Sequence, residues 1–293
     1  MEEVLIACRF LHFSAAMLLF GASTFSGLLA PSGFGASLGK KMAPAGTGLV
    51  IILAITAVLW LCLESGLAGD GWSDTVNPAA LGAVFQYTSF GQVWIVRLVL
   101  IALLLLAALL PKIPFRTPVV LVLSAAVLGS LGFVGHAAMQ DGALGWAHEL
   151  NHVVHLLSAA FWVGCLPPLL VTLNYLRQPE NRRDAATALR RFSGFGHFAV
   201  ALVIATGLVN TYLTLGRVPT DFSSPYQGLL ATKIGLVALM MALALFNRYV
   251  TVPRLASGKP DALRLMALGT IAEIVVGAAA VALVSAFATF DPV

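Results

Sequence analysis

Residues 92–110 of the chain read QVWIVRLVLIALLLLAALL, and this stretch decides what kind of fold the protein has. A single charged residue, Arg97, interrupts an otherwise apolar run. A helix needs about 20 predominantly apolar residues to cross the hydrocarbon core of a bilayer. The stretch therefore predicts a transmembrane helix.

Similar runs recur along all 293 residues of the chain. The sequence predicts eight such helices, at residues 4–29, 47–67, 92–110, 118–139, 152–175, 195–215, 229–250 and 265–288. The chain is 59% hydrophobic and only 10% charged, whereas about a quarter of the residues in a soluble domain are charged. We therefore expect an all-α integral membrane protein, a bundle of eight transmembrane helices forming a single domain over residues 1–293.

Positive charges are distributed unevenly between the loops that join these helices. Thirteen of the 17 Lys and Arg residues fall in the first, third, fifth and seventh loops or at the adjoining helix ends. They are Lys40, Lys41, Lys112, Arg116, Arg177, Arg182, Arg183, Arg190, Arg191, Arg248, Arg254, Lys259 and Arg264. The positive-inside rule makes these loops cytoplasmic and both termini extracytoplasmic. This distribution accounts for the net charge of +4, and we expect no nucleic-acid partner.

The fifth loop contains a basic stretch, RQPENRRDAATALRRF, at residues 177–192. It predicts an interfacial or soluble helix between the fifth and sixth transmembrane helices.

Four of the six histidines lie close together in the sequence: His136, His148, His152 and His155, with Met139 between them. The predicted topology places this segment on the extracytoplasmic side. In a helix, positions 148, 152 and 155 fall on one face. Imidazole suits Cu, Zn, Ni and Fe, and thioether sulfur selects Cu(I), so the pattern favours copper. The alternative is that interfacial histidines only form hydrogen bonds between loops or extend toward water.

His12 lies about 13 Å along the first predicted helix, near the middle of the membrane. A titratable group at that depth needs a partner. One interpretation is a second metal ligand farther along the path, with Met17 as a soft neighbour. The other is a neutral histidine that is hydrogen-bonded to another helix.

Several further charged residues fall within the predicted helices. Glu64, paired with Arg97 or Lys233, would form a structural contact, and the functional alternative is that Glu64 and Glu273 belong to a cation path. The segments FGASTFSG and GSLGFVGH contain small residues that predict close helix contacts. Walker, HExxH and nucleophile-elbow motifs are absent from the sequence, so we expect no enzyme.

Residues 190–290 carry a recognisable signature. They include RRFSGFGHFAVALVIATGLVNTYLTLGRV and SPYQGLLATKIGLVALMMALALFNRYVTVPRL. These stretches resemble the copper resistance protein D (CopD, PcoD) family, whose pattern is RFS, TGxxN, YGxLLxxK and NRxxxPxL, with Gln227 inserted after the tyrosine. HVVHLLSAAFWVGCLPPLL is similar to the family's histidine-bearing helix, so that His152, His155 and Trp162 correspond.

The resemblance implies passage of copper across the bacterial inner membrane, usually inward, often with a periplasmic copper-binding partner of the copper resistance protein C type. The leading hypothesis is that Cu(I) or Cu(II) is captured on the periplasmic side by the clustered histidines and Met139 and relayed past His12 and Met17. Two alternatives stay open. One is a membrane b-haem protein that carries electrons. The other is a non-transporting docking partner of a periplasmic copper carrier.

Overall fold

The structure, a computed structural model, describes residues 1–110, 116–287 and 290, and only the backbone of residues 136, 137, 256 and 287. Throughout these residues the regular structure is helical, without strands. The α-helices are α1 (Glu2–Thr24), α2 (Ser32–Ala68), α3 (Pro78–Tyr87), α4 (Ser89–Leu109), α5 (Arg116–Gly129), α6 (Gly142–Gly164), α7 (Leu166–Leu173), α8 (Arg182–Leu215), α9 (Pro225–Phe246), α10 (Val252–Ala256) and α11 (Ala262–Phe287).

Eight helical spans among the described residues are long and apolar enough to cross a membrane. Each predicted segment overlaps a different one of them, which confirms the predicted number of spans. Many large apolar side chains on their outer faces are exposed, including Ile95, Val99 and Leu106 on α4. In water such a surface would be costly, whereas lipid tails cover it without loss.

The boundaries of several helices differ from the predictions. α2 begins at Ser32 rather than at residue 47. The fourth span leaves α-helical geometry after Gly129, and residues 130–133 and 135–138 form 3-10 turns. The fifth span begins at Gly142, ten residues before the predicted start at residue 152, and it is interrupted at Cys165, before a pair of prolines.

Residues 182–192 of the predicted basic helix are helical, but they do not form a separate helix. Residues 182–192 form the first turns of α8, which runs to Leu215 as a single helix. The Ala, Leu and Arg residues of this stretch favour helix, and no proline interrupts them. At 1.5 Å per residue, such a helix is roughly 50 Å long and extends beyond a bilayer core of about 30 Å.

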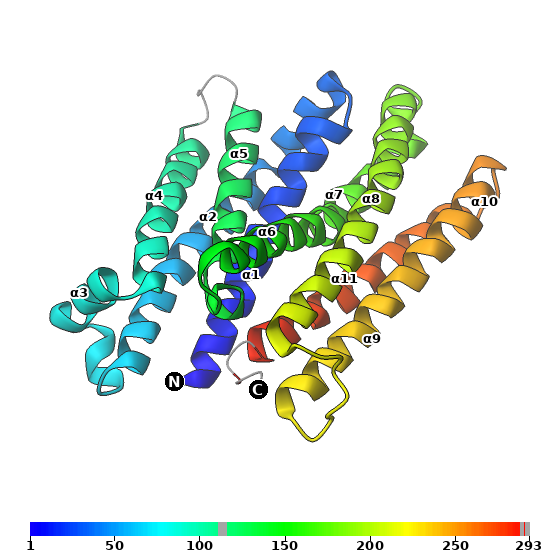
Figure 1. The fold of residues 1–293 in the computed structure, drawn as a ribbon. Coiled ribbons are helices and arrows are strands. Elements are labelled where there is room, and N and C mark those ends of the chain that lie inside the picture. The colour runs from blue at the N-terminus through cyan, green and yellow to red at the C-terminus, as the bar shows by residue number, and fades with distance from the viewer. Residues whose placement is uncertain (111–115, 288–289, 291–293) are drawn as a thin grey trace.

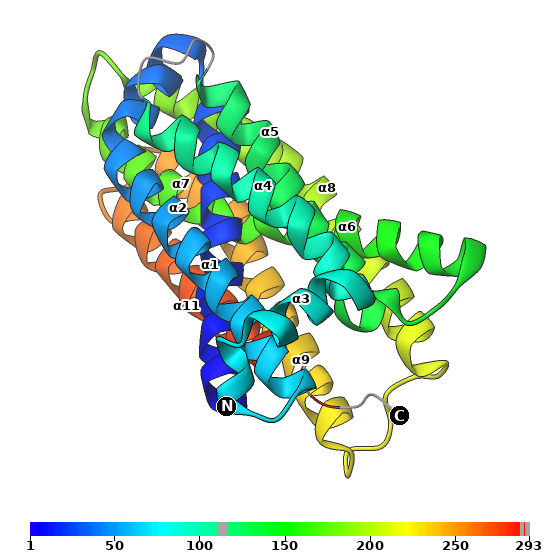
Figure 2. The same ribbon diagram turned by 90° about the vertical axis from the view of Figure 1, so that its left-hand side faces the viewer.

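α1 lies near the centre of the bundle and packs against α2, α5, α6 and α11. α2, α4 and α5 form one side, whereas α8, α9 and α11 form the other, as Figure 1 shows. α6 crosses between the two sides and packs against both α1 and α8. The rotated view in Figure 2 shows the start of α1 and the end of α11 near the same end of the bundle.

Glycines allow α6 to approach its neighbours closely, as the small-residue segments predicted. A Cβ atom on Gly21 of α1 would collide with the backbone of Gly164 on α6, and one on Gly164 would collide with the backbone of Met17. A Cβ atom on Gly132 would lie 2.5 Å from a side-chain carbon of Val153 on α6. These contacts hold α6 in the middle of the molecule.

The described loops and helix ends that carry most of the cations lie together at the end of the bundle opposite the start of α1 (Figure 1). Arg116 donates from Nε and Nη2 to the carbonyl oxygens of Ala107 and Ala108 at the end of α4, each at 3.0 Å. Arg191 donates to the carbonyl oxygen of Leu29 at 3.2 Å. These cations therefore satisfy carbonyl groups at or near helix ends, where positive charge is favoured.

Candidate functional site

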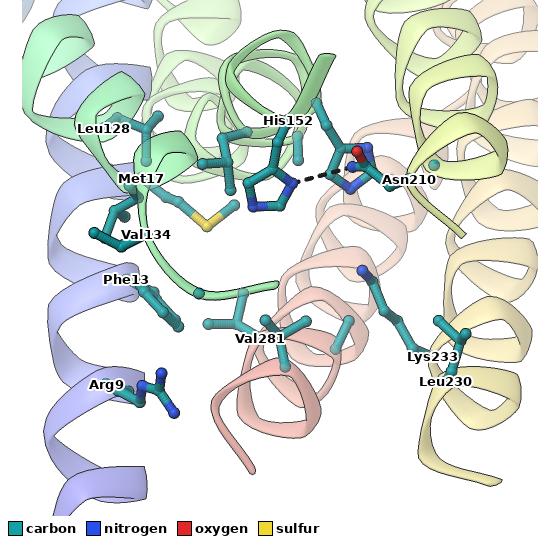
Figure 3. A pocket seen from close by; sticks show the side chains of 18 of the residues that line it. Arg9, Phe13, Met17, Leu128, Val134, His152, Asn210, Leu230, Lys233 and Val281 are labelled. Atoms are coloured by element: carbon teal, nitrogen blue, oxygen red, sulfur yellow. Dashed lines mark hydrogen bonds between the residues drawn. The ribbon is translucent and has the colours of Figure 1, made fainter. Parts of the chain in front are cut away.

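A cavity of about 620 Å³ lies inside the bundle. α1, α2 and α6 line one side of the cavity, and α8, α9 and α11 line the other. Its wall is mostly apolar, with a small number of polar side chains directed inward, which is typical of a small-ligand site. Figure 3 shows this space, with Arg9 and Met17 on α1 and Lys233 on α9.

Three of the predicted histidines reach this cavity from α6: His148, His152 and His155, called here the α6 histidine row. His148 and His155 are buried, and His152 is half-buried. The rings of His152 and His155 are nearly parallel, with centroids 6.1 Å apart. The row extends over two helical turns, about 10 Å. Its three rings therefore lie one after another along the cavity wall.

His148 is oriented by Gln140, which precedes α6. Nε2 of Gln140 donates to the carbonyl oxygen of Leu213 at 2.8 Å, and its Oε1 lies 2.6 Å from Nδ1 of His148. Because a carbonyl oxygen can only accept, the amide must turn its nitrogen toward Leu213 and its oxygen toward His148. Nδ1 of His148 therefore carries a proton, and Nε2 of the neutral ring has a lone pair.

His155 is oriented in the same way by Thr206 on α8. The Thr206 hydroxyl donates to the carbonyl oxygen of Leu202 at 2.5 Å, and its oxygen lies 2.9 Å from Nδ1 of His155. With the hydroxyl proton directed to the Leu202 carbonyl, Nδ1 of His155 is the donor. Metal-binding histidines usually donate through one nitrogen and ligate through the other, and both His148 and His155 have this arrangement.

His152 is oriented differently. Nδ2 of Asn151 donates to the carbonyl oxygen of Thr206 at 3.0 Å and to Oδ1 of Asn210 at 2.7 Å. Asn210 must therefore turn its Nδ2 toward Nδ1 of His152, at 3.0 Å (Figure 3). A donor facing Nδ1 requires a lone pair there, so a neutral His152 carries its proton on Nε2.

The other predicted metal ligands do not all line the cavity. Met17 lines the cavity from α1. Met139 is half exposed and does not line it. The backbone of His136 lies in the 3-10 turn Gly135–Ala138, and its side chain is outside the described part of the structure.

His12 is fully buried between α1, α2 and α4, and it does not line the cavity. Its Nδ1 lies 2.8 Å from Oγ1 of Thr56, whose hydroxyl donates to the carbonyl oxygen of Ile52 at 2.7 Å. Its Nε2 faces Nε and Nη2 of Arg97, at 3.1 Å and 2.6 Å. Since guanidinium groups only donate, Nε2 must accept. These contacts match the interpretation of a neutral histidine bonded to other helices.

The charged residues within the membrane spans also have defined contacts. Arg97 is fully buried and donates to His12, the Val127 carbonyl and Ser130, so it does not pair with Glu64. Glu64 instead accepts from Nε1 of Trp60 at 2.9 Å, beside the cavity.

Glu273 lies behind the cavity wall, where it joins three parts of the chain. Its Oε1 accepts from Nδ2 of Asn247 at 2.7 Å, and its Oε2 accepts from Nε1 of Trp162 at 3.4 Å. Trp162 itself lines the cavity, whereas Glu273 does not. These contacts connect α6, α11 and the π-helical turn after α9.

Two site residues were not found from the sequence: Gln140, which orients His148, and Asn151, which holds the amide of Asn210. Thr206 and Asn210 lie in the TGxxN signature, but their contacts with the histidines were not predicted. Gln140 and Asn151 are polar residues within or beside an apolar segment, and this feature of the sequence could have identified them. Asn151 contacts Thr206 and Asn210, and Gln140 contacts Leu213, all far away in the sequence, so these contacts could not be predicted. Within the described residues, no three His, Cys, Asp or Glu side chains are grouped closely enough to hold one metal ion.

Comparison with known proteins covers both halves of the chain. Residues 1–146 match the family described as copper resistance protein D-like, N-terminal domain, and residues 186–287 match copper resistance protein D. The inner membrane protein YebZ of Escherichia coli K12 is 36% identical over 288 residues, 98% of each chain.

Two further relatives carry copper in their names. Copper resistance protein D of Pseudomonas syringae pv. tomato is 30% identical over 86% of this chain and 84% of its own. Copper transport protein CutJ of Bacillus subtilis 168 is 27% identical over 80% of this chain and 44% of its own. No solved structure matches the chain. With eight apolar spans and relatives along its full length, the chain belongs to the copper resistance protein D family as a multi-pass protein of the bacterial inner membrane.

Proposed function

We propose that this protein transports copper inward across the inner membrane and that the cavity is where the ion is held. The observation that carries the proposal is the α6 histidine row facing Met17 across one internal cavity. Imidazole nitrogen and thioether sulfur are together suited to copper, and the thioether favours Cu(I). The family and the name of CutJ point to the same ion.

The proposed direction of transport follows from the charge distribution. The end of the bundle that carries most of the cations faces the cytoplasm by the positive-inside rule. The start of α1 then faces the periplasm, and Glu2, Arg9 and Glu64 lie on the periplasmic part of the cavity wall. Copper enters there and reaches the α6 histidine row. Transport requires no change in the covalent structure of the cargo, so the proposal assigns no enzymatic activity.

The test is a double substitution, His152→Ala with His155→Ala, assayed for copper bound per purified protein and for copper uptake by cells. Loss of two imidazoles from the cavity is expected to reduce both by at least tenfold. His197→Ala is the matched control because His197 is exposed and does not line the cavity. Wild-type copper content and uptake in the double variant would disprove the site. A Soret band in the wild-type protein would support the b-haem alternative.

We also propose that a periplasmic copper carrier of the copper resistance protein C type docks on the acidic loops at the periplasmic end. Hydrogen bonds from the Asp70 N–H and the Asn77 side chain lower the pKa of Asp74, and hydrogen bonds from Ser223 lower that of Asp221. Both carboxyl groups therefore stay ionised in mildly acidic conditions, and they present negative charge to a partner.

Binding of such a carrier to the protein in nanodiscs tests the docking surface. Asp74→Lys combined with Asp221→Lys is expected to weaken binding at least tenfold, and added salt is expected to weaken the wild-type interaction. Glu180→Lys, at the opposite end of the bundle, is the control. Equal binding by all three proteins would refute this surface.

A further inference from the structure

We infer that Asn210 controls which nitrogen of His152 is available to copper, and that copper binding at this ring breaks the hydrogen bond between Asn151 and Asn210. Asn210 would then be a positioning residue that links the metal site to the contact between α6 and α8. The inference rests on the proposed function, because copper is the cargo that it concerns.

The direction of the hydrogen bonds around His152 is set by a backbone group. The carbonyl oxygen of Thr206 can only accept, so Asn151 must present its nitrogen to it. That same nitrogen faces Asn210 at 2.7 Å, which requires Oδ1 of Asn210 on this side. Nδ2 of Asn210 then faces His152. Rotating either amide alone would place two donors or two acceptors against each other.

This arrangement leaves His152 with its proton on Nε2. The same nitrogen projects into the cavity, on the opposite side of the ring from Asn210, and Met17 lines the same space (Figure 3). A protonated nitrogen has no lone pair for a metal. His152 as it stands is thus a hydrogen-bond donor toward the cavity, whereas its neighbours His148 and His155 carry their protons on Nδ1.

Copper binding through Nε2 requires the proton to move to Nδ1, with no net gain or loss of protons. The new Nδ1–H needs an acceptor, and Asn210 supplies one by rotating its amide so that Oδ1 faces the ring. Nδ2 of Asn210 then faces Nδ2 of Asn151, and two donors cannot bond. Asn151 remains bound to the Thr206 carbonyl, so the bond between Asn151 and Asn210 is lost.

The consequence is a difference between neighbouring histidines of the row. His148 and His155 can accept copper without changing any hydrogen bond, because their Nδ1–H groups already have acceptors. His152 accepts copper only when one of the hydrogen bonds that join α6 to α8 is broken. Occupation of this position is therefore communicated to α8, which packs against α6 along the cavity.

The first test uses nitrogen NMR spectra of the copper-free protein labelled with 15N-histidine, in which the two tautomers have distinct shifts. His152, assigned with a His152→Gln variant, is expected in the Nε2–H form, and His155 in the Nδ1–H form. Asn210→Asp presents only acceptors to Nδ1 and is expected to convert His152 to the Nδ1–H form. An Nδ1–H signal for His152 in the wild-type protein would overturn the inference.

The second test measures affinity for Cu(I) by competition with a chromophoric chelator. Asn210→Asp is expected to bind Cu(I) more tightly by about tenfold, the lower end of what partners of ligating histidines contribute. Asn151→Ala frees the Asn210 amide to rotate, and it is expected to act in the same direction without adding charge. In a His152→Ala background the ring is absent, so neither substitution should raise the affinity for Cu(I).

These outcomes separate the inference from the proposed function. A gain that persists after His152→Ala would arise from the added charge, and it would refute the role of the tautomer. Tight Cu(I) binding by the wild-type protein, with no gain in either variant, would refute the inference and leave the copper site standing. A protein that binds no Cu(I), yet shows the expected tautomers, would refute the proposed function instead.

Discussion

His12 uses both of its ring nitrogens in contacts with other helices, as donor to Thr56 and as acceptor from Arg97. A metal ion at Nε2 would have to displace a guanidinium group that is fully buried. In the α6 histidine row, by contrast, His155 lines the cavity and combines burial with a committed Nδ1 proton. Buried histidines in this protein are therefore distinguished by what faces each nitrogen.

This difference predicts separate effects for two alanine substitutions. His12→Ala leaves N–H groups of Arg97 without an acceptor inside the bundle, which is expected to cost on the order of 3 kcal/mol of stability. The melting temperature in detergent should fall, while the copper content of the folded protein stays at the wild-type level. His197→Ala, at an exposed position, should change neither quantity. A stable His12→Ala protein that has lost its copper would show instead that His12 is a ligand.

At the scale of helices, α6 is placed by residues that have no side chain. Gly21 and Gly164 meet where α1 and α6 cross, and the span that contains α6 is the most deeply buried of the eight. This crossing brings the histidine row between the two sides of the bundle, because α6 packs against α1 on one side and against α8 on the other. The cavity therefore depends on a contact that tolerates no Cβ atom.

Gly164→Ala is expected to prevent normal packing of α1 against α6, because the added methyl group would collide with the Met17 backbone. Overpacking of this kind costs roughly 1–3 kcal/mol, and more where backbone must move. The folded fraction and the melting temperature measure the effect. Gly46→Ala is the control, since nothing lies within 4 Å of a Cβ atom there. Equal stability of the two variants would contradict the role of the crossing.

For the whole molecule, the separation of charge between its two ends predicts an orientation in the membrane. Ser257 is exposed near the cation-rich end, and Ser73 is exposed in the loop after α2 at the other end. With the three native cysteines replaced by serine, Ser73→Cys should react with a membrane-impermeant thiol reagent in intact spheroplasts. Ser257→Cys should react only after the membrane is opened. The reverse labelling pattern would reject the assigned orientation and, with it, the inward direction of transport.

Much of the architecture was predictable because hydrocarbon imposes a simple requirement. Each apolar run had to form a helix, since lipid offers no partners for backbone groups, and Gln92–Leu110 became α4 with ends at Ser89 and Leu109. Boundaries were less predictable. The basic residues 182–192 could continue a helix or form a separate one, and continuity with α8 was decided by local propensity rather than by hydropathy.

The candidate site was likewise predictable only in part from the sequence. Sequence spacing alone determined that His148, His152 and His155 share a helix face, because an α-helix repeats every 3.6 residues. Only the tertiary structure decided that Met17 lines the same cavity, that His12 lies against Arg97 instead, and that Asn210 faces His152. A helix's own sequence specifies which side chains share a face. What that face meets depends on how the helices pack, and those contacts join residues far apart in the chain.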